Sequence, residues 1–91
     1  MNEKVYARSI LSRAIVRYAP GDSGSIEFFH YGKKEWVPDK ENTYYGIYSG
    51  FDDSEVITEE EANNLIAYYL SGKSFKRGEN WRQLVSSEGK E

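Results

Sequence analysis

The stretch of sequence that decides the fold is Thr58-Glu59-Glu60-Glu61-Ala62-Asn63-Asn64-Leu65-Ile66-Ala67-Tyr68-Tyr69-Leu70. Thr58 and Glu61 have the spacing of a capping box, in which each side chain bonds the other residue's main-chain amide at a helix start. Apolar residues then recur at the spacing of one helix face, at Ala62, Leu65, Ile66, Tyr69 and Leu70. Gly72 suits the left-handed position that follows many helices. The pattern predicts an amphipathic helix over residues 59–70.

Upstream of this helix, residues 26–37 have the pattern of a β-hairpin. Residues 26–31 are rich in aromatic and β-branched side chains, and Gly32 opens a short turn before Glu35-Trp36-Val37. Pro38 then ends the second strand, because proline lacks the amide that a central strand needs. Since side chains alternate between the two faces of a strand, we expect the face of Ile26 and Phe28 to meet the core. Phe29 would then need a second cover or would lie exposed.

Two other segments are ambiguous. Residues 6–18 fit a helix with Ile10, Leu11 and Ala14 on one side, or a strand over 14–18 that pairs antiparallel with 26–31. We favour the strand. Residues 44–48 fit either an edge strand or a single helical turn.

These patterns together predict an α+β fold. We expect a small antiparallel sheet of two to four strands, with the hairpin at about 26–37 and one amphipathic helix at about 59–70 packed on it. Residues 1–74 would form a single compact domain. Residues 75–91 would be a C-terminal tail, partly disordered or forming a short docked helix over 81–85.

The composition limits the chemistry that the chain can perform. Fourteen residues are aromatic and fifteen are Leu, Ile or Val, whereas there is one His and no Cys. A core of this size depends on the large area that aromatic rings bury. Because His30 has no partner carboxylate that the pattern places beside it, and no metal or phosphate motif is present, we expect no enzymatic activity and no cofactor or metal.

Charge is unevenly distributed along the chain. The net charge is −3, but residues 39–64 carry eight acidic residues against Lys40 alone. No apolar stretch has the length of a membrane span, and the first residues lack the apolar core of a signal peptide. We therefore expect a cytoplasmic protein that does not enter a membrane.

A cluster of rings beside acidic residues is the best candidate for a binding site. Tyr and Trp are enriched among the anchors of protein interfaces. The predicted protein-binding residues are Trp36, Tyr44, Tyr45, Tyr48, Asp52 and Asp53. The favoured function is a non-catalytic, intracellular protein-binding or accessory module.

Two alternatives stay open beside it. Bases interleaved with aromatic rings suit single-stranded nucleic acid, and the tail offers Lys76, Arg77, Trp81 and Arg82. The acidic stretch 39–61 could instead mimic nucleic acid and block a basic partner. An exposed sheet edge also leaves homodimerisation open.

One resemblance adds a little to this reading. The hairpin end Glu35-Trp36-Val37-Pro38-Asp39, a glycine-containing spacer and then Ile57-Thr58-Glu59-Glu60-Glu61-Ala62 resemble small uncharacterised bacterial proteins. The resemblance covers roughly residues 14–70. It implies no activity and no functional residue.

Overall fold

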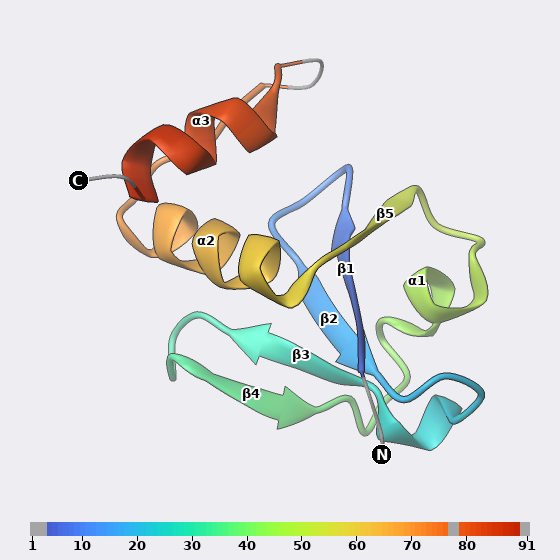
Figure 1. Ribbon diagram of the computed structural model, residues 1–91. Helices are drawn as coiled ribbons and strands as arrows, with labels where there is room; N and C mark the ends of the chain where they lie inside the picture. Colours follow the sequence, from blue (N-terminus) through green and yellow to red (C-terminus); the bar gives the residue numbers. More distant parts are fainter. Residues whose placement is uncertain (1–3, 77–78, 90–91) are drawn as a thin grey trace.

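A computed structural model describes residues 4–76 and 79–89 (Figure 1). The strands are β1 (Val5–Ser9), β2 (Ile15–Tyr18), β3 (Glu27–His30), β4 (Glu35–Pro38) and β5 (Ser54–Ile57). The helices are α1 (Tyr45–Ser49), α2 (Glu59–Leu70) and α3 (Trp81–Gly89), and a short 3-10 turn spans Ser23–Ser25. The predicted α+β class is confirmed.

The sheet has five strands in the order β4-β3-β2-β1-β5, and every neighbouring pair is antiparallel. The expected two to four strands were therefore too few. The ambiguous segment 6–18 contains two strands joined by a turn, and β2 pairs with β3 as expected. Residues 54–57, for which the sequence predicted no strand, form β5 because they pair antiparallel with β1.

The main helix lies on the other face of the hairpin from the one expected. α2 packs over Tyr6, Ile15 and Ile57, with Phe29 and Tyr31 of the hairpin end beside them. The face of Phe28 is covered instead by Ile47 of α1 and by Tyr44, the residue just before that helix. The position of α2 follows from β5. Ile57 is the last residue of this strand, and the chain enters α2 on the side of the sheet to which the Ile57 side chain points. Figure 1 shows α2 and α3 together on one side, with α1 apart from them.

The start of α2 is as predicted. The Glu61 amide donates to the Thr58 hydroxyl and the Thr58 amide to the Glu61 carboxylate, each at 3.0 Å. Both halves of the capping box are therefore present. Gly72 adopts φ +87° just after the helix, a conformation that glycine tolerates without strain.

The buried stripe of α2 differs from the expected one at its C-terminal end. Ala62, Leu65, Ile66 and Tyr69 are buried as predicted, but Leu70 is 41% exposed and Tyr68 is buried instead. The chain turns back after α2, so that Phe75 lies 5.9 Å from the Tyr68 ring and covers it. This contact between residues seven apart in the chain adds Tyr68 to the buried face, and Leu70 is left outside it.

The tail contributes to the same core. Trp81 and Val85 of α3 are buried in the cluster that contains Leu65 and Ile66 of α2. The helix extends to Gly89, beyond the expected end at Val85, and residues 90–91 lie outside the described part of the chain.

Candidate functional site

The second face of the sheet carries the most exposed aromatic side chains of the described residues. α1 is attached by Ile47, which is buried against Ala7 and Val16. The rings on either side pack onto strands: Tyr44 lies 4.9 Å from Phe28, and Tyr48 lies 4.8 Å from Tyr18. These contacts place the short helix across the sheet with its remaining residues directed outward.

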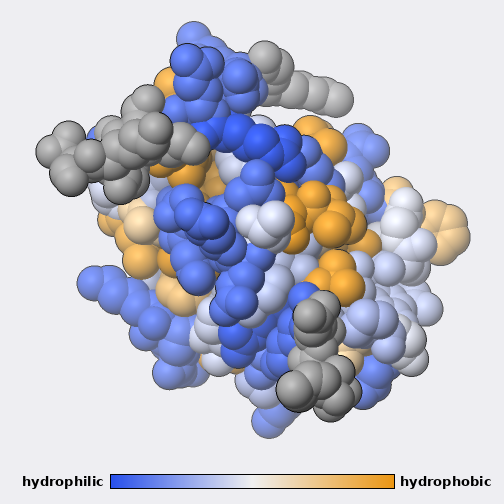
Figure 2. Space-filling view, viewed as in Figure 1, coloured by the Kyte–Doolittle hydropathy of each residue, from blue (hydrophilic) through white to orange (hydrophobic). Residues whose placement is uncertain are grey.

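Two rings of this region reach solvent. Tyr45 is 45% exposed and Phe51, just after the helix, is 88% exposed. Figure 2 shows apolar colour at the loop between α1 and β5, on the right of the view. A single exposed apolar residue is ordinary, whereas two exposed rings within one short segment make this region the candidate interaction surface. We call Tyr45, Tyr48, Phe51, Asp52 and Asp53 the α1 surface.

A tight turn holds Phe51 outside. Gly50 ends α1 at φ +88°, and its amide donates to the carbonyl oxygens of Gly46 and Ile47. The Asp52 amide then donates to Gly46 at 3.1 Å, so the chain folds back and leaves Phe51 at the tip. A Cβ atom at Gly46 would collide with the Asp52 carboxylate, which lies against the helix. The turn therefore determines where the ring points.

The aspartates lie beside a second loop. The Ile10 amide donates to the Asp53 carbonyl oxygen at 3.1 Å, which brings the β1–β2 turn next to the α1 surface. Leu11, at the tip of that turn, is exposed. Between the two loops lies a shallow groove of about 280 Å³, lined by Ser9, Leu11, Ser12, Ala14, Thr43, Tyr44, Ile47, Asp52 and Asp53. Most of the predicted site residues therefore lie in this region of the structure, namely Tyr44, Tyr45, Tyr48, Asp52 and Asp53.

Trp36 is the predicted site residue that the structure does not place there. Its ring lies on the α2 face, 5.9 Å from Tyr6 and 5.6 Å from Phe29. The Arg17 guanidinium stacks over it at 4.3 Å. Trp36 therefore lies on the opposite side of the sheet from Phe51.

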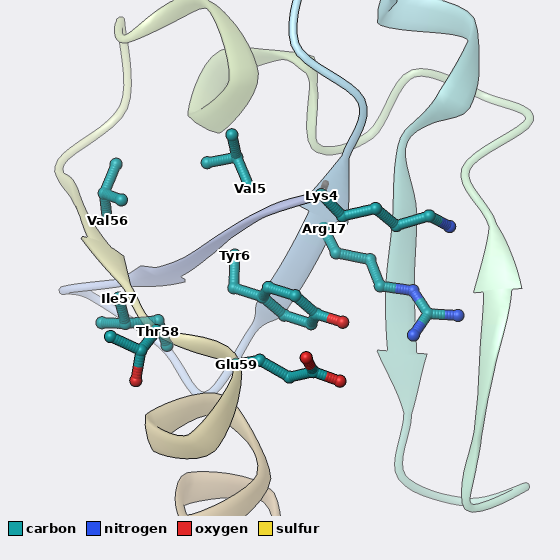
Figure 3. A pocket seen from close by; sticks show the side chains of 8 residues that line it. All are labelled: Lys4, Val5, Tyr6, Arg17, Val56, Ile57, Thr58 and Glu59. Atoms are coloured by element: carbon teal, nitrogen blue, oxygen red, sulfur yellow. The ribbon is translucent and has the colours of Figure 1, made fainter. Parts of the chain in front are cut away.

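A groove of about 650 Å³ opens beside the start of β1 (Figure 3). Its two basic side chains, Lys4 and Arg17, both bond the same Glu27 oxygen, at 3.1 and 2.7 Å. Partial burial would raise the pKa of Glu27, but these two hydrogen bonds outweigh it and the pKa lies below its ordinary value. Glu27 therefore offsets one of the two positive charges, and Glu59 is the acidic side chain of the groove lining.

Two of the predicted nucleic-acid-binding residues of the tail, Trp81 and Arg82, make contacts within the fold. Trp81 is buried, and its Nε1 donates to Glu55 at 3.2 Å. Arg82 pairs with Glu55 at 2.8 Å and with Glu61 at 2.7 Å. Lys76 is exposed, and Arg77 lies outside the described residues. Trp81 thus presents no open ring on which a base could stack.

Sequence reasoning missed the residue at the centre of this arrangement, Arg8. It is buried, bonds Glu55 at 3.2 Å, and has the rings of Phe75 and Trp81 at 5.5 and 5.0 Å. Partial burial would raise the pKa of Glu55, but the hydrogen bonds from Arg82 and Trp81 outweigh it and hold the pKa low. No local pattern marks Arg8, since its partners come from β5 and the tail.

His30 has a role in the hairpin turn. Its Nδ1 accepts the Lys33 amide at 3.1 Å, directly after β3. Within residues 4–76 and 79–89, no three His, Cys, Asp or Glu side chains are grouped so that they could hold a metal ion. In the same part of the chain, no helix has the length and apolarity to cross a bilayer.

Comparison with models of protein families, with curated proteins and with solved structures gives no match to this chain. The resemblance to small bacterial proteins stays a prediction. The candidate site therefore rests on its geometry alone.

Proposed function

We propose that this protein is a non-catalytic, cytoplasmic binding module that recognises another protein through the α1 surface. The observation that carries the proposal is the 88% exposure of Phe51 at the tip of a hydrogen-bonded turn. An aromatic ring on an ordered main-chain turn presents apolar area with only two side-chain torsions left to fix on binding.

The surface also has the composition of an interface. Tyr45 and Tyr48 pack against each other with ring centroids 5.6 Å apart, and Phe51 follows Tyr48 by three residues in the chain. Tyrosine and phenylalanine are enriched in interface cores, which have a polar rim. Asp52 and Asp53 supply such a rim, and their charge favours a partner with basic residues around an apolar pocket.

The experiment compares two double variants as baits in extract of the source cells, with and without nuclease. Tyr45→Ser/Phe51→Ser removes the two exposed rings of the α1 surface. Leu70→Ser/Leu84→Ser is the matched control, since both leucines are exposed side chains on the helices of the other face. We expect a defined protein that survives nuclease and binds the parent and the control, but not the ring variant.

The opposite results would overturn the proposal. If the two variants capture the partner protein equally well, the interface does not lie on the α1 surface. Bound material that disappears with nuclease would favour nucleic acid as the partner. Thermal unfolding of each bait, measured in parallel, separates loss of binding from loss of folding.

A further inference from the structure

β5 is an edge strand whose outer main chain is open. Among the described residues it pairs with β1 alone, at the end of the strand order. The Ile10 amide bonds the Asp53 carbonyl, and bonded pairs alternate along an antiparallel ladder. With the observed register, Arg8↔Glu55 and Tyr6↔Ile57 are then the bonded pairs. The amide and carbonyl groups of Ser54 and Val56 therefore point away from β1.

The opposite edge, β4, is less open to pairing. The Asp39 amide donates to the Ile26 carbonyl oxygen at 2.9 Å. By the same alternation, the main-chain groups of Trp36 and Pro38 point away from β3. Pro38 has no amide to offer, and Lys33 and Lys34 occupy the adjoining turn. Proline and lysine at an edge discourage strand addition. β5 contains neither residue, so it is the edge that another strand can join.

The side chains along β5 define what kind of strand fits. Val56, at the centre of the open edge, is 67% exposed. Two exposed carboxylates precede the strand, Asp52 and Asp53, and two follow it, Glu59 and Glu60. β5 is four residues long, so one acidic pair lies just before this edge and the other lies in the first turn of α2, just after it.

We propose that β5 binds an extended segment of a partner protein as a sixth strand, with an apolar residue opposite Val56 and Lys or Arg at both ends. This rests on the proposed function, because it names the partner's chemistry and the mode of recognition. In strand addition the main chain supplies hydrogen bonds, and alternate side chains supply specificity. The acidic pairs at both ends complement basic residues whichever way the segment runs.

A second copy of this chain fits the edge less well. Antiparallel self-pairing centred on Val56 would bring the Asp52 and Asp53 end of one β5 toward the start of α2 in the other copy, where Glu59 and Glu60 lie. Like charges brought close together disfavour such a pair. A basic segment meets the same carboxylates with opposite charge.

The groove beside the end of β5 offers room for a side chain of the segment. It is lined by Val5 and Val56, which point to the same side in Figure 3, and by Ile57 and Glu59. Lys4 and Arg17 in the same groove are held by Glu27. Glu27 offsets one of these two cations, and Glu59, where α2 begins, is the acidic side chain of the groove that can meet a base.

The test uses synthetic peptides with a fluorescent label and the full chain, read by fluorescence anisotropy. The probe has a Thr-Val-Thr-Val-Thr centre with two arginines at each end. One control peptide carries glutamates at the ends, and another keeps the arginines but has N-methylated amides in the centre. We expect saturable binding of the probe that weakens as salt rises, and about tenfold or greater weakening for each control.

The chain offers a matched pair of variants at the edge itself. Val56→Pro removes an outward amide and leaves the ladder to β1, whereas Val56→Thr retains that amide. We expect Val56→Pro to lose the probe and Val56→Thr to bind it within about threefold of the parent. If Val56→Pro fails to fold, the N-methylated peptide tests the same hydrogen bonds on the unaltered protein.

Three results would overturn the proposal. They are equal binding of all three peptides, no binding of the probe, and a concentration-dependent dimer that Val56→Pro abolishes, which would assign the edge to a second copy. A failure of the strand-addition proposal can be told apart from a failure of the proposed function. Capture that depends on Tyr45 and Phe51, without binding of the probe, would retain the α1 surface and remove the edge from consideration.

Discussion

The two faces of the sheet are covered to different depths. On one face, α2 and α3 enclose a cluster that includes Leu65, Tyr69 and Trp81. On the other, the five-residue helix α1 buries Ile47 over Ala7 and Val16. The thin cover leaves Tyr45 and Phe51 in solvent, whereas the thick cover encloses even the tyrosines of α2. The difference indicates that the face of α2 and α3 carries most of the stability of the domain, and it supports the proposal that the other face is a contact surface.

The largest effect is expected on the thickly covered face. Leu65 is completely buried, so Leu65→Ala should lower the free energy of unfolding by ~2–5 kcal/mol through lost burial and a cavity. Leu70→Ala, the same substitution in the same helix at a half-exposed position, is the control and should cost much less. Urea denaturation followed by circular dichroism measures both. Equal costs would show that α2 is not anchored by its buried stripe.

On the thinly covered face, Ile47→Ala should cost less than Leu65→Ala. We expect about 2 kcal/mol, the lower end of the range for a buried isoleucine, because a one-turn helix can settle into the space. The same denaturation experiment applies. A cost as large as that of Leu65→Ala would mean that both faces contribute equally to stability, which would break the comparison.

Acid should act on the α2 and α3 face first. The pKa of Glu55 is held below its unfolded value of about 4.5 by Arg82 and Trp81 despite partial burial. Its stabilising contribution is therefore present above that value and is lost as pH falls through the lower folded pKa. In a Trp36→Phe background, fluorescence of Trp81 should report release of α3 on acidification.

Two variants sharpen this pH experiment. Glu55→Gln should weaken the dependence, since the titrating group is gone while an acceptor for Trp81 remains. Glu60→Gln, at an exposed glutamate in the first turn of α2, is the control and should leave the curve in place. An unchanged curve in Glu55→Gln would assign the acid response to other carboxylates, Glu61 first among them.

The smallest effect on stability is expected at Phe51. Phe51→Ser should change the free energy of unfolding by about 0.5 kcal/mol or less, because the ring is already in solvent. Phe29→Ser, at a ring that packs against Trp36 and Tyr31, should cost clearly more. Thermal unfolding of the two variants is the measurement. A large loss for Phe51→Ser would make that ring part of the core.

Parts of the fold were predictable because their signals are local. The capping box, the apolar spacing and Gly72 gave α2 its residues, and the hairpin appeared where β-forming residues surround a turn. The turn between β1 and β2 left no comparable signal, since Ile10 and Leu11 extended the apparent helical spacing through it. β5 was missed because a four-residue strand in an acidic segment forms through its pairing with β1.

The candidate site was predictable in part for the same reason. Tyr45, Tyr48, Asp52 and Asp53 are close in sequence, so one loop and one helical turn bring them together. Phe51, the most exposed of these rings, was not distinguished from the buried phenylalanines, because its exposure depends on the Gly50 turn. Trp36 was grouped with these residues but lies apart from them, on the α2 face, because the face on which a hairpin residue lies depends on strand register.

The sequence by itself determined the class of the fold, the limits of α2, and the material of the core, because capping, helical periodicity and composition are properties of neighbouring residues or of the whole chain. Only the tertiary structure decided which face α2 covers, that Arg8 and Trp81 are buried together, and that β5 is left as an open edge. These features depend on contacts between segments that are far apart in the chain. Their energies arise on assembly, so no local pattern records them.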